Sequence, residues 1–369
     1  MYRPHGMILT AGPSITQKEI NYVNDAVTNG WNYHMFDYKE KLERKFANYI
    51  GSKYVMAVSG ATGAMQLALA CLDIKPGDEV ILPDLAFYAA SDVVMRLGAK
   101  PIFIDVLPDT WCIDPDKIKK AISSRTKAIM PVYMYGNLCE MDEIMNIAKK
   151  HGLYVVEDAA PALGSIYKGK KPGTFGDFGA YSFQGAKIAI SGIGGMLVTN
   201  SKKNLDKARM LNEHGKDPKR KFWQIRVGYS YHMSNIQAAL ALAQIERIEE
   251  FVRRKNKIFK WYARKLGKLG GISMNPDKTN TRSNKWMSSI VLDKKFEYTR
   301  DQLMRAMAKQ LVDTRPFFYP VSMFPMYKEI NTPVAHHLGL NGINLPSGVN
   351  LTEEQVNYIS DCLVRKLTK

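Results

Sequence analysis

The chain has 369 residues, 46% of them hydrophobic and 24% charged, which is typical of a soluble globular protein with one large domain and a smaller one. No uncharged apolar run is long enough to cross a bilayer, and the N-terminus lacks the apolar core of a secretory signal, so we expect a cytoplasmic protein with no membrane partner. The formal net charge of +17 could attract nucleic acid, but the Lys and Arg residues are dispersed and no nucleic-acid-binding motif accompanies them. A solvated basic surface, which also attracts small anions, is the favoured interpretation, and no nucleic-acid partner is expected.

Short β-branched runs alternate with helical patterns over the first two hundred residues. The near-continuous apolar character of these runs suits strands buried on both faces, and the alternation predicts a mainly parallel sheet flanked by helices. The last two strands are separated too briefly for a helical crossover, which predicts a mixed sheet. The expected strands are 78–84, 100–106, 127–135, 153–160, 178–183 and 194–200, and the expected helices are 62–73 and 140–152.

A long helical region is predicted at 233–266, where Ser234 is a candidate N-cap. Ile236, Leu240 and Ala243 recur at helical spacing and predict the buried stripe of this region.

A second, smaller α/β domain is predicted after this helix, with a strand at 285–292 and a helix at 299–311. The chain is accordingly divided into a large domain at 1–250, N-terminal segment included, and a small C-terminal domain at 251–369.

The cysteines and histidines do not indicate a metal site. The four cysteines are far apart and form no CxxC pair, so we expect small packing residues in a reducing compartment. His34, His214 and the adjacent pair His336 and His337 lack metal-ligand spacing with carboxylates. No metal is therefore predicted.

Three residues could carry chemistry together. Lys187 stands in an apolar run before a glycine turn, where a buried ammonium is costly unless it is paired or chemically altered. Asp158 follows an apolar strand at the sheet edge where open α/β sheets bind ligands, although a helix cap or turn acid is the simpler interpretation of this residue alone. Thr62 begins a helix after a glycine turn, which makes either an anion site or a plain cap.

Pyridoxal 5′-phosphate (PLP) would use these three features at once. Its phosphate would lie at the helix start, its pyridine nitrogen against Asp158, and its aldehyde on the Lys187 amine, whose nucleophilicity depends on a lowered pKa. Each residue has a mundane explanation, whereas the ordered combination has few.

The order of motifs resembles the DegT/DnrJ/EryC1/StrS family of PLP-dependent aminotransferases over nearly the whole chain. The resemblance implies fold type I, with a large α/β/α domain built on a mixed, mainly parallel sheet, followed by a small α/β domain. Within the family it extends to the GDP-perosamine synthases, through KFWQIRVGYSYHMSN (221–235), TRPFFYPVSMFPMY (314–327) and LPSGVNLTEEQ (345–355). The family motifs are SGATGAMQLAL (59–69), PDLAFYAAS (83–91), the segment 155–183, Lys187, GIGGMLVTN (192–200) and the segment 227–248.

The resemblance also implies roles for individual residues. Lys187 would bond covalently to the cofactor and shuttle protons, and Asp158 would keep the pyridine nitrogen protonated. Phe87 would stack on the ring, and Ser230 of a partner subunit would reach the phosphate, so the active sites would be shared in a homodimer. The phosphate contacts within one chain would be Thr62, Gly63 and Ser182.

Several positions depart from the family pattern. Ile193 replaces the usual glutamate of the glycine turn, and Pro161 faces the cofactor hydroxyl without a side-chain hydrogen bond. Ser230 stands where asparagine is usual, and Ala61 stands at a typical glycine. These departures indicate either an altered substrate or a weakened grip on the cofactor.

Three further residues are substrate candidates. Tyr33 and His34 lie in a segment that the resemblance places against the substrate. Arg315 precedes a proline among aromatic residues and could clamp a phosphate or carboxylate, although a surface arginine explains it about as well.

The expected activity is amino transfer from L-glutamate to a nucleotide-linked 4-keto-6-deoxysugar, for surface polysaccharide such as lipopolysaccharide or capsule. The departures keep open another carbonyl acceptor, such as a small phosphorylated ketone. They also leave open a catalytically weakened PLP-binding paralogue.

Overall fold

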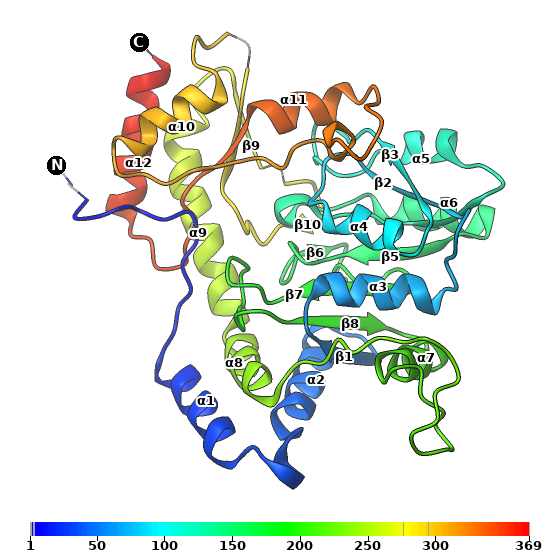
Figure 1. Ribbon diagram of the computed structural model, residues 1–369. Coiled ribbons are helices and arrows are strands. Elements are labelled where there is room, and N and C mark those ends of the chain that lie inside the picture. Colours follow the sequence, from blue (N-terminus) through cyan, green and yellow to red (C-terminus); the bar gives the residue numbers. More distant parts are fainter. Residues whose placement is uncertain (1, 3, 276, 294, 369) are drawn as a thin grey trace.

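The computed structural model describes residues 2, 4–275, 277–293 and 295–368, and Figure 1 shows how their elements are arranged. The centre of the molecule is a seven-stranded sheet in which five neighbouring strands are parallel, while β8 runs antiparallel to both β7 and β1. This confirms the predicted mixed, mainly parallel sheet. The strands in order across the sheet are β1 (Tyr54–Val58), β8 (Gly195–Thr199), β7 (Phe178–Ser182), β5 (Tyr154–Asp158), β4 (Thr126–Ile129), β2 (Glu79–Pro83) and β3 (Lys100–Ile104).

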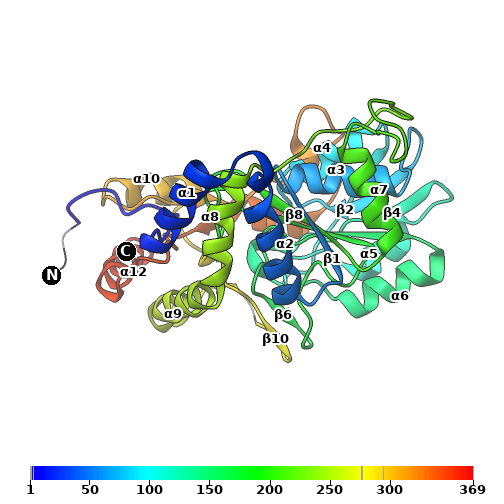
Figure 2. The same cartoon turned by 90° about the horizontal axis from the view of Figure 1, so that it is seen from below.

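Helices cover both faces of the sheet, as the view from below shows (Figure 2). Alternate residues of each strand supply the two cores: Val55 and Ala57 of β1 enter one apolar cluster, and Met56 and Val58 enter the other. One face carries α3 (Ala61–Cys71), α4 (Ala89–Arg96) and α7 (Lys202–Asn212), and the other carries α2 (Asp37–Ile50), α5 (Pro115–Ala121) and α6 (Met141–His151).

The strand predicted at 127–135 is shorter than expected. β4 ends at Ile129, and Pro131, which has no backbone N–H, interrupts the ladder two residues later. The chain then forms a turn at Met134–Gly136 (η2), in which Tyr135 adopts a positive φ of 51°.

The long helical region is two helices, α8 (Asn235–Glu246) and α9 (Ile248–Leu266), which meet at Arg247. Ser234 caps α8 in a capping box with Gln237, which confirms the predicted N-cap. The predicted stripe is wrong in part, because Ile236 and Leu240 are only partly buried. The helices α1 (Gln17–Asn29) and α2 both pack against α8, so its buried surface extends to Ala238, Ala239 and Leu242.

A second, antiparallel sheet forms the small C-terminal unit with α9 and the helices that follow it. The predicted strand at 285–292 begins only at Ser289, and the predicted helix at 299–311 ends at Ala308. Residue 250 lies within α9, and the domain division there stays a prediction. The strands are, in order, β12 (Arg315–Pro316), β13 (Gly342–Asn344), β11 (Ser289–Leu292) and β9 (Ile272–Met274); the helices are α10 (Arg300–Ala308), α11 (Pro333–Asn341) and α12 (Glu353–Leu367).

Three shorter features complete the chain. The strands β6 (Ile166–Tyr167) and β10 (Thr281–Arg282) pair with each other, and single 3₁₀ turns lie at Asn32–His34 (η1) and Val321–Met323 (η3).

All four cysteines are buried and free, as expected for packing residues. None of the helices that the structure describes combines the length and apolar character that a membrane crossing requires.

Candidate active site

A cavity of about 630 Å³ lies at the carboxyl ends of β5 and β7, beside the start of α3 and the strand β12. The strands β5 and β7 are parallel neighbours, and Asp158 pairs with Ala180. Ser182 and the loop that follows it therefore lie at the same edge of the sheet as Asp158. A larger hollow of about 950 Å³ lies between α2 and residues 232–236, and none of the predicted catalytic residues lines it. The predicted residues that line the 630 Å³ cavity are Thr62, Phe87, Asp158, Ser182, Lys187 and Arg315.

Lys187 lies on the loop between β7 and β8, and hydrogen bonds between backbone groups of this loop fix its shape. Ser191 donates to the Phe183 carbonyl at 2.7 Å, and Lys187 itself donates its backbone N–H to the Gln184 carbonyl at 2.7 Å. Burial against the pocket wall lowers the pKa of the Lys187 amine to about 8, and the Asp158 carboxylate opposes this shift. A substantial fraction of the amine is therefore neutral, and nucleophilic, near physiological pH.

Asp158 ends β5, and its Oδ1 accepts a hydrogen bond from the Ala160 backbone N–H at 3.1 Å. Burial raises the pKa of this carboxyl, while the charge of Lys187 acts in the opposite direction. Within the described residues no direct ion pair joins the two side chains, although they line one cavity and influence each other's charge. The amine and the carboxylate therefore share one cavity without direct contact.

The start of α3 supplies donors for an anion. Its N-cap, Gly60, has extended backbone and no side chain, so no side-chain cap satisfies the N–H groups of the first turn. Gly60, Ala61 and Thr62 all line the cavity. A helix start that is left uncapped toward a cavity is suited to bind a phosphate group.

Gly63, one residue further into α3, packs against Tyr231. A Cβ at this position would lie 2.9 Å from Cγ of Tyr231, so the glycine allows the ring to approach the helix. The Tyr231 carbonyl in turn accepts the Ser59 backbone N–H at 3.0 Å. Ser230, the neighbouring residue, is exposed, and its contact with a partner subunit stays a prediction.

Aromatic and basic side chains surround the mouth of the cavity. Phe87 is 41% exposed and lies 5.3 Å from the Phe318 ring, centroid to centroid. Arg315 is exposed on β12 and forms an ion pair with Asp313, with 3.4 Å between Nε and Oδ2. Phe87 is therefore accessible to a planar ligand, and Arg315 is accessible to an anionic one.

Tyr33 and His34 lie outside this cavity. They form part of η1, where Tyr33 is almost fully exposed and His34 Nδ1 lies 3.0 Å from Oδ2 of Asp37. Within one chain they do not meet Lys187.

Trp286, Tyr135 and Asn344 are among the cavity-lining residues that the sequence did not indicate. The Lys187 ammonium lies 3.7 Å from the centroid of the Trp286 ring, and Tyr135 and Asn344 line the same space. The sequence pattern predicts only that Trp286 lies in a strand and that Tyr135 ends another. Trp286 bonds to Ala186, 100 positions away, and Tyr135 to Phe318, 183 positions away, so no local pattern in the sequence indicates these contacts.

The residues present fit PLP. An amine of lowered pKa faces a buried carboxylate across a cavity, an uncapped helix start offers donors to a phosphate, and Phe87 can cover a planar ring. Together with the α/β/α layers, this arrangement is that of the PLP-dependent enzymes of fold type I.

The chain belongs to the DegT/DnrJ/EryC1/StrS aminotransferase family, whose family model matches residues 13–364. It is similar to the GDP-perosamine synthase of Escherichia coli O157:H7, with 40% identity over 95% of this chain and 96% of that protein. It is also similar to the GDP-perosamine synthase of Caulobacter vibrioides, with 38% identity over 95% of this chain and 96% of that one.

The fold agrees with solved structures of the same kind. A Streptococcus pneumoniae protein described as a sugar aminotransferase, Spr1654, has been solved in a PLP form and a PMP form. Its PLP form superimposes with a TM-score of 0.92 at 26% identity, covering 98% of this chain and 99% of that one. The predicted family, fold class, enzyme class and cofactor are confirmed.

Proposed function

We propose that the chain moves an amino group from L-glutamate to a nucleotide-linked 4-keto-6-deoxysugar, as a GDP-perosamine synthase, in the synthesis of surface polysaccharide. The observation that carries this proposal is the pairing of Lys187 with Asp158 across one cavity, in a chain 38–40% identical to two GDP-perosamine synthases along almost their whole length. The intact pair also speaks against a paralogue that only binds the cofactor. Nothing in the cavity favours a small phosphorylated ketone.

PLP supplies, when bound, an aldehyde that reacts with amines and a ring that withdraws electrons from the adjacent carbon. Lys187 would bond to this aldehyde in the absence of substrate; once released as a free amine, it would remove a proton from the α-carbon of the donor in the first half-reaction and deliver a proton to the amine-bearing carbon of the acceptor in the second. Its pKa of about 8 suits both directions, because such an amine gains and loses protons near neutral pH.

The remaining residues bind and orient. Asp158 keeps a proton on the pyridine nitrogen, because a buried carboxylate is stabilised by a cationic partner. Thr62, Ser182 and the N–H groups at the start of α3 hold the phosphate, and Phe87 covers one face of the ring. Gly63 supports this phosphate site through its packing on Tyr231.

We assign Arg315 to the acceptor. It lies at the cavity mouth with only Asp313 as an ion-pair partner among the described residues, so its guanidinium can reach a phosphate of a nucleotide sugar. Tyr33 and His34, which do not line the cavity of their own chain, are assigned to the substrate side of a partner's site.

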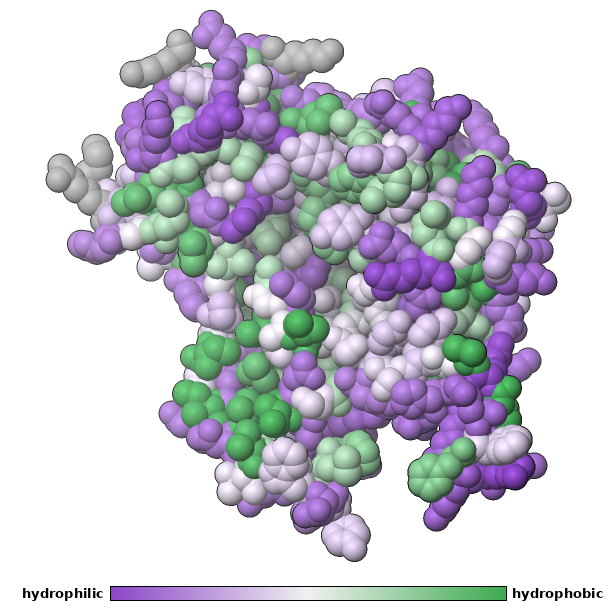
Figure 3. Space-filling view, in the orientation of Figure 1, coloured by the Kyte–Doolittle hydropathy of each residue, from purple (hydrophilic) through white to green (hydrophobic). Residues whose placement is uncertain are grey.

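A homodimer completes the proposal. Apolar side chains gather on the surface over α1 (Figure 3), where the exposed residues include Ile20 and Val27, and Trp31 lines the neighbouring 950 Å³ hollow. A surface of this kind typically marks an interface. A second copy bound there would bring Ser230 to the phosphate of its partner's cavity. The cytoplasmic location stays a prediction.

The acceptor can be identified directly. The pyridoxamine form of the protein is mixed with a GDP-linked 4-keto-6-deoxyhexose, its UDP-linked counterpart and dihydroxyacetone phosphate, and the return of the PLP absorption band is followed. We expect the GDP-linked sugar to restore the band fastest. Restoration by dihydroxyacetone phosphate alone would show that the assigned substrate class is wrong.

A further inference from the structure

Trp286 touches the reactive lysine in two ways. The Lys187 Nζ lies 3.7 Å from the centroid of its ring, well inside the range of a cation–π contact. The indole Nε1–H donates a hydrogen bond to the Ala186 carbonyl at 2.8 Å, on the residue directly before Lys187. One side chain therefore contacts both the amine and the backbone that carries it.

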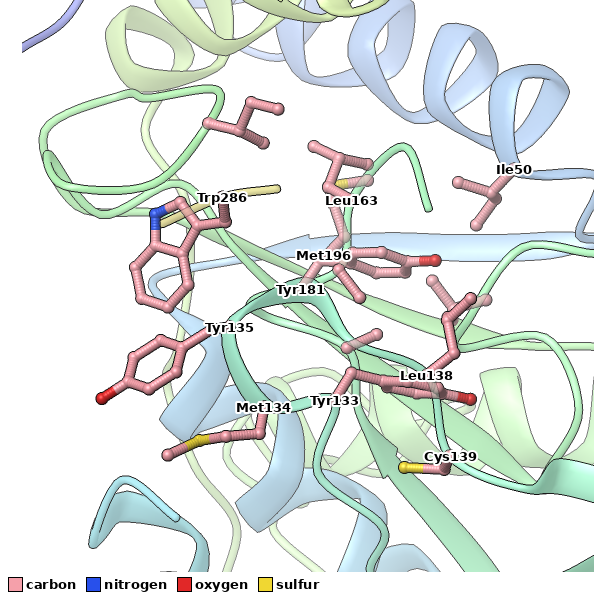
Figure 4. Packing of buried hydrophobic residues seen from close by; sticks show 14 of the residues in the cluster. Ile50, Tyr133, Met134, Tyr135, Leu138, Cys139, Leu163, Tyr181, Met196 and Trp286 are labelled. Atoms are coloured by element: carbon pink, nitrogen blue, oxygen red, sulfur yellow. The ribbon is translucent and has the colours of Figure 1, made fainter. Parts of the chain in front are cut away.

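The indole is itself held firmly. The Trp286 backbone N–H donates to Oδ1 of Asn284 at 2.9 Å, and the amide of Asn284 donates to the Pro161 carbonyl at 2.9 Å, next to the cavity. On another side the ring lies 5.9 Å from Tyr135, centroid to centroid, and Figure 4 shows the two rings as neighbours. Trp286 is only 4% exposed, so it has little freedom to leave Lys187.

A buried lysine supports Trp286 from the long helix. Lys255 of α9 donates from Nζ to the Trp286 carbonyl at 2.9 Å and to the Ser347 carbonyl at 2.5 Å. Its side chain is 4% exposed, and no carboxylate pairs with it among the described residues. A buried amine that binds two carbonyl groups fixes the positions of both, because breaking either bond leaves a polar group unsatisfied.

A tryptophan at this place could simply fill space and exclude water, in which case any apolar side chain would serve. The two contacts argue otherwise: the π face is turned to the ammonium, and the N–H is used on the loop of that same lysine.

We propose that Trp286 is a positioning residue for Lys187, which stabilises the ammonium form of the free amine on its ring face and anchors the lysine loop through its N–H. This inference rests on the proposed role of Lys187. While the substrate occupies the cofactor, the ring holds the freed amine in place and stabilises the ammonium that forms when this amine takes up a proton, and it thereby offsets part of the burial that favours the neutral form.

The test measures the pKa of the Lys187 amine in the cofactor-free full chain. Lysines are reductively methylated with ¹³C-formaldehyde, the Lys187 signal is assigned by its loss in Lys187→Arg, and its pH titration is followed by NMR. The variants Trp286→Phe and Trp286→Leu both lack the indole N–H, but only phenylalanine keeps an aromatic face, so the difference between them isolates the ring. The solvent-facing Trp223→Leu is the control.

We expect the pKa to fall by about one unit in Trp286→Leu and by less in Trp286→Phe, with no change in Trp223→Leu. An unchanged or raised pKa in Trp286→Leu would refute the proposal, since smaller bulk admits water and moves the pKa upward. If Trp286→Leu fails to fold, Trp286→Met, which also lacks an aromatic face, takes its place, and an unchanged or raised pKa in that variant refutes the proposal.

Loop anchoring has its own readout. Amide hydrogen exchange of residues 184–192 should become faster in Trp286→Phe than in the parent chain, and equal rates would remove the anchoring role. Neither measurement requires turnover. A chain that shows both effects but fails to transaminate would retain this inference and overturn the proposed function.

Discussion

Asp158 at the end of β5 and Lys187 on the loop between β7 and β8 line one cavity, and each favours the charged form of the other although no direct ion pair joins them in the described structure. Burial acts against both charges, lowering the pKa of the amine to about 8 and raising that of the carboxyl. The ring of PLP would present a positively charged nitrogen to Asp158 and a carbonyl group to the amine of Lys187. It would thereby offset the unfavourable burial of both charges. The pair is therefore more stable with PLP than without it.

Replacing Lys187 by alanine should abolish transamination, because no other amine lines the cavity among the described residues. We expect the rate of each half-reaction to fall by about 10²–10⁴-fold or more, the usual contribution of a general acid–base group. Borohydride should also fail to link PLP covalently to the variant. Lys203→Ala, on the exposed side of α7, is the matched control and should behave as the parent.

Asp158→Asn should lower the rate of proton removal by at least about 100-fold, since an amide does not stabilise a protonated pyridine nitrogen. It should also lower the pKa of Lys187 below about 8 in the cofactor-free chain, because the charge that raises it is gone. Stopped-flow spectroscopy with glutamate and NMR titration measure the two effects. An unchanged rate would place the partner of the ring nitrogen elsewhere.

The buried amine of Lys255 predicts a specific pH dependence of stability. Burial lowers its pKa from 10.5 to about 7. Above pH 7 the unfolded chain therefore binds one proton more than the folded chain, and the free energy of unfolding rises with pH, by up to about 1.4 kcal/mol per unit. Below pH 7 both states are protonated and this contribution is flat.

Urea unfolding of the cofactor-free chain at a series of pH values measures this slope. Lys187, with its pKa of about 8, adds its own contribution only at higher pH, so the interval from pH 7 to pH 8 reports mainly Lys255. Lys255→Met should flatten the curve there, whereas Lys257→Met, on the exposed side of the same helix, should leave it unchanged. Equal slopes in the two variants would contradict the buried, uncharged state of Lys255.

Shared active sites can be tested by mixing two inactive chains. If Ser230 serves the cavity of its partner, a dimer of Lys187→Ala with Ser230→Trp has one site with both defects and one with neither. Co-expression should then recover about a quarter of the parent activity, since half of the dimers are mixed and each has one working site. Purified dimers of either variant alone are the controls. No recovery would mean that each chain builds its own site.

The sequence predicts those parts of the fold and site that depend on neighbouring residues. The apolar runs that became β2, β3, β5, β7 and β8 suit strands buried on both faces, and Asp158 and Lys187 stand in local motifs at their ends. Sequence reasoning did not name β1, α4 or α5, and it joined α8 to α9. The pattern of apolar residues continues through Arg247, whereas the turn there depends on contacts with α1, where Arg247 pairs with Glu19 at 2.8 Å.

Long-range contacts account for the rest of the site. Trp286 approaches Lys187 because Lys255 of α9 binds its carbonyl, and because Asn284, two residues before it, donates to the distant Pro161 carbonyl. Nothing in the stretch NKWMSS indicates either long-range bond. Likewise, Tyr135 adopts a positive φ in a turn. Its hydroxyl accepts a hydrogen bond from the Phe318 backbone N–H at 2.9 Å, a contact between distant parts of the chain. Such residues have no periodic or spacing signal.

The hydrogen bond from Lys255 to the Trp286 carbonyl links α9, the long helix of the C-terminal unit, to the aromatic side chain beside the Lys187 amine. Because the indole N–H also binds the Ala186 carbonyl, α9, the indole and the lysine loop are joined through successive hydrogen bonds. A change in the packing of α9 would therefore reach the atom that gives and receives protons, although no residue of this helix lines the cavity.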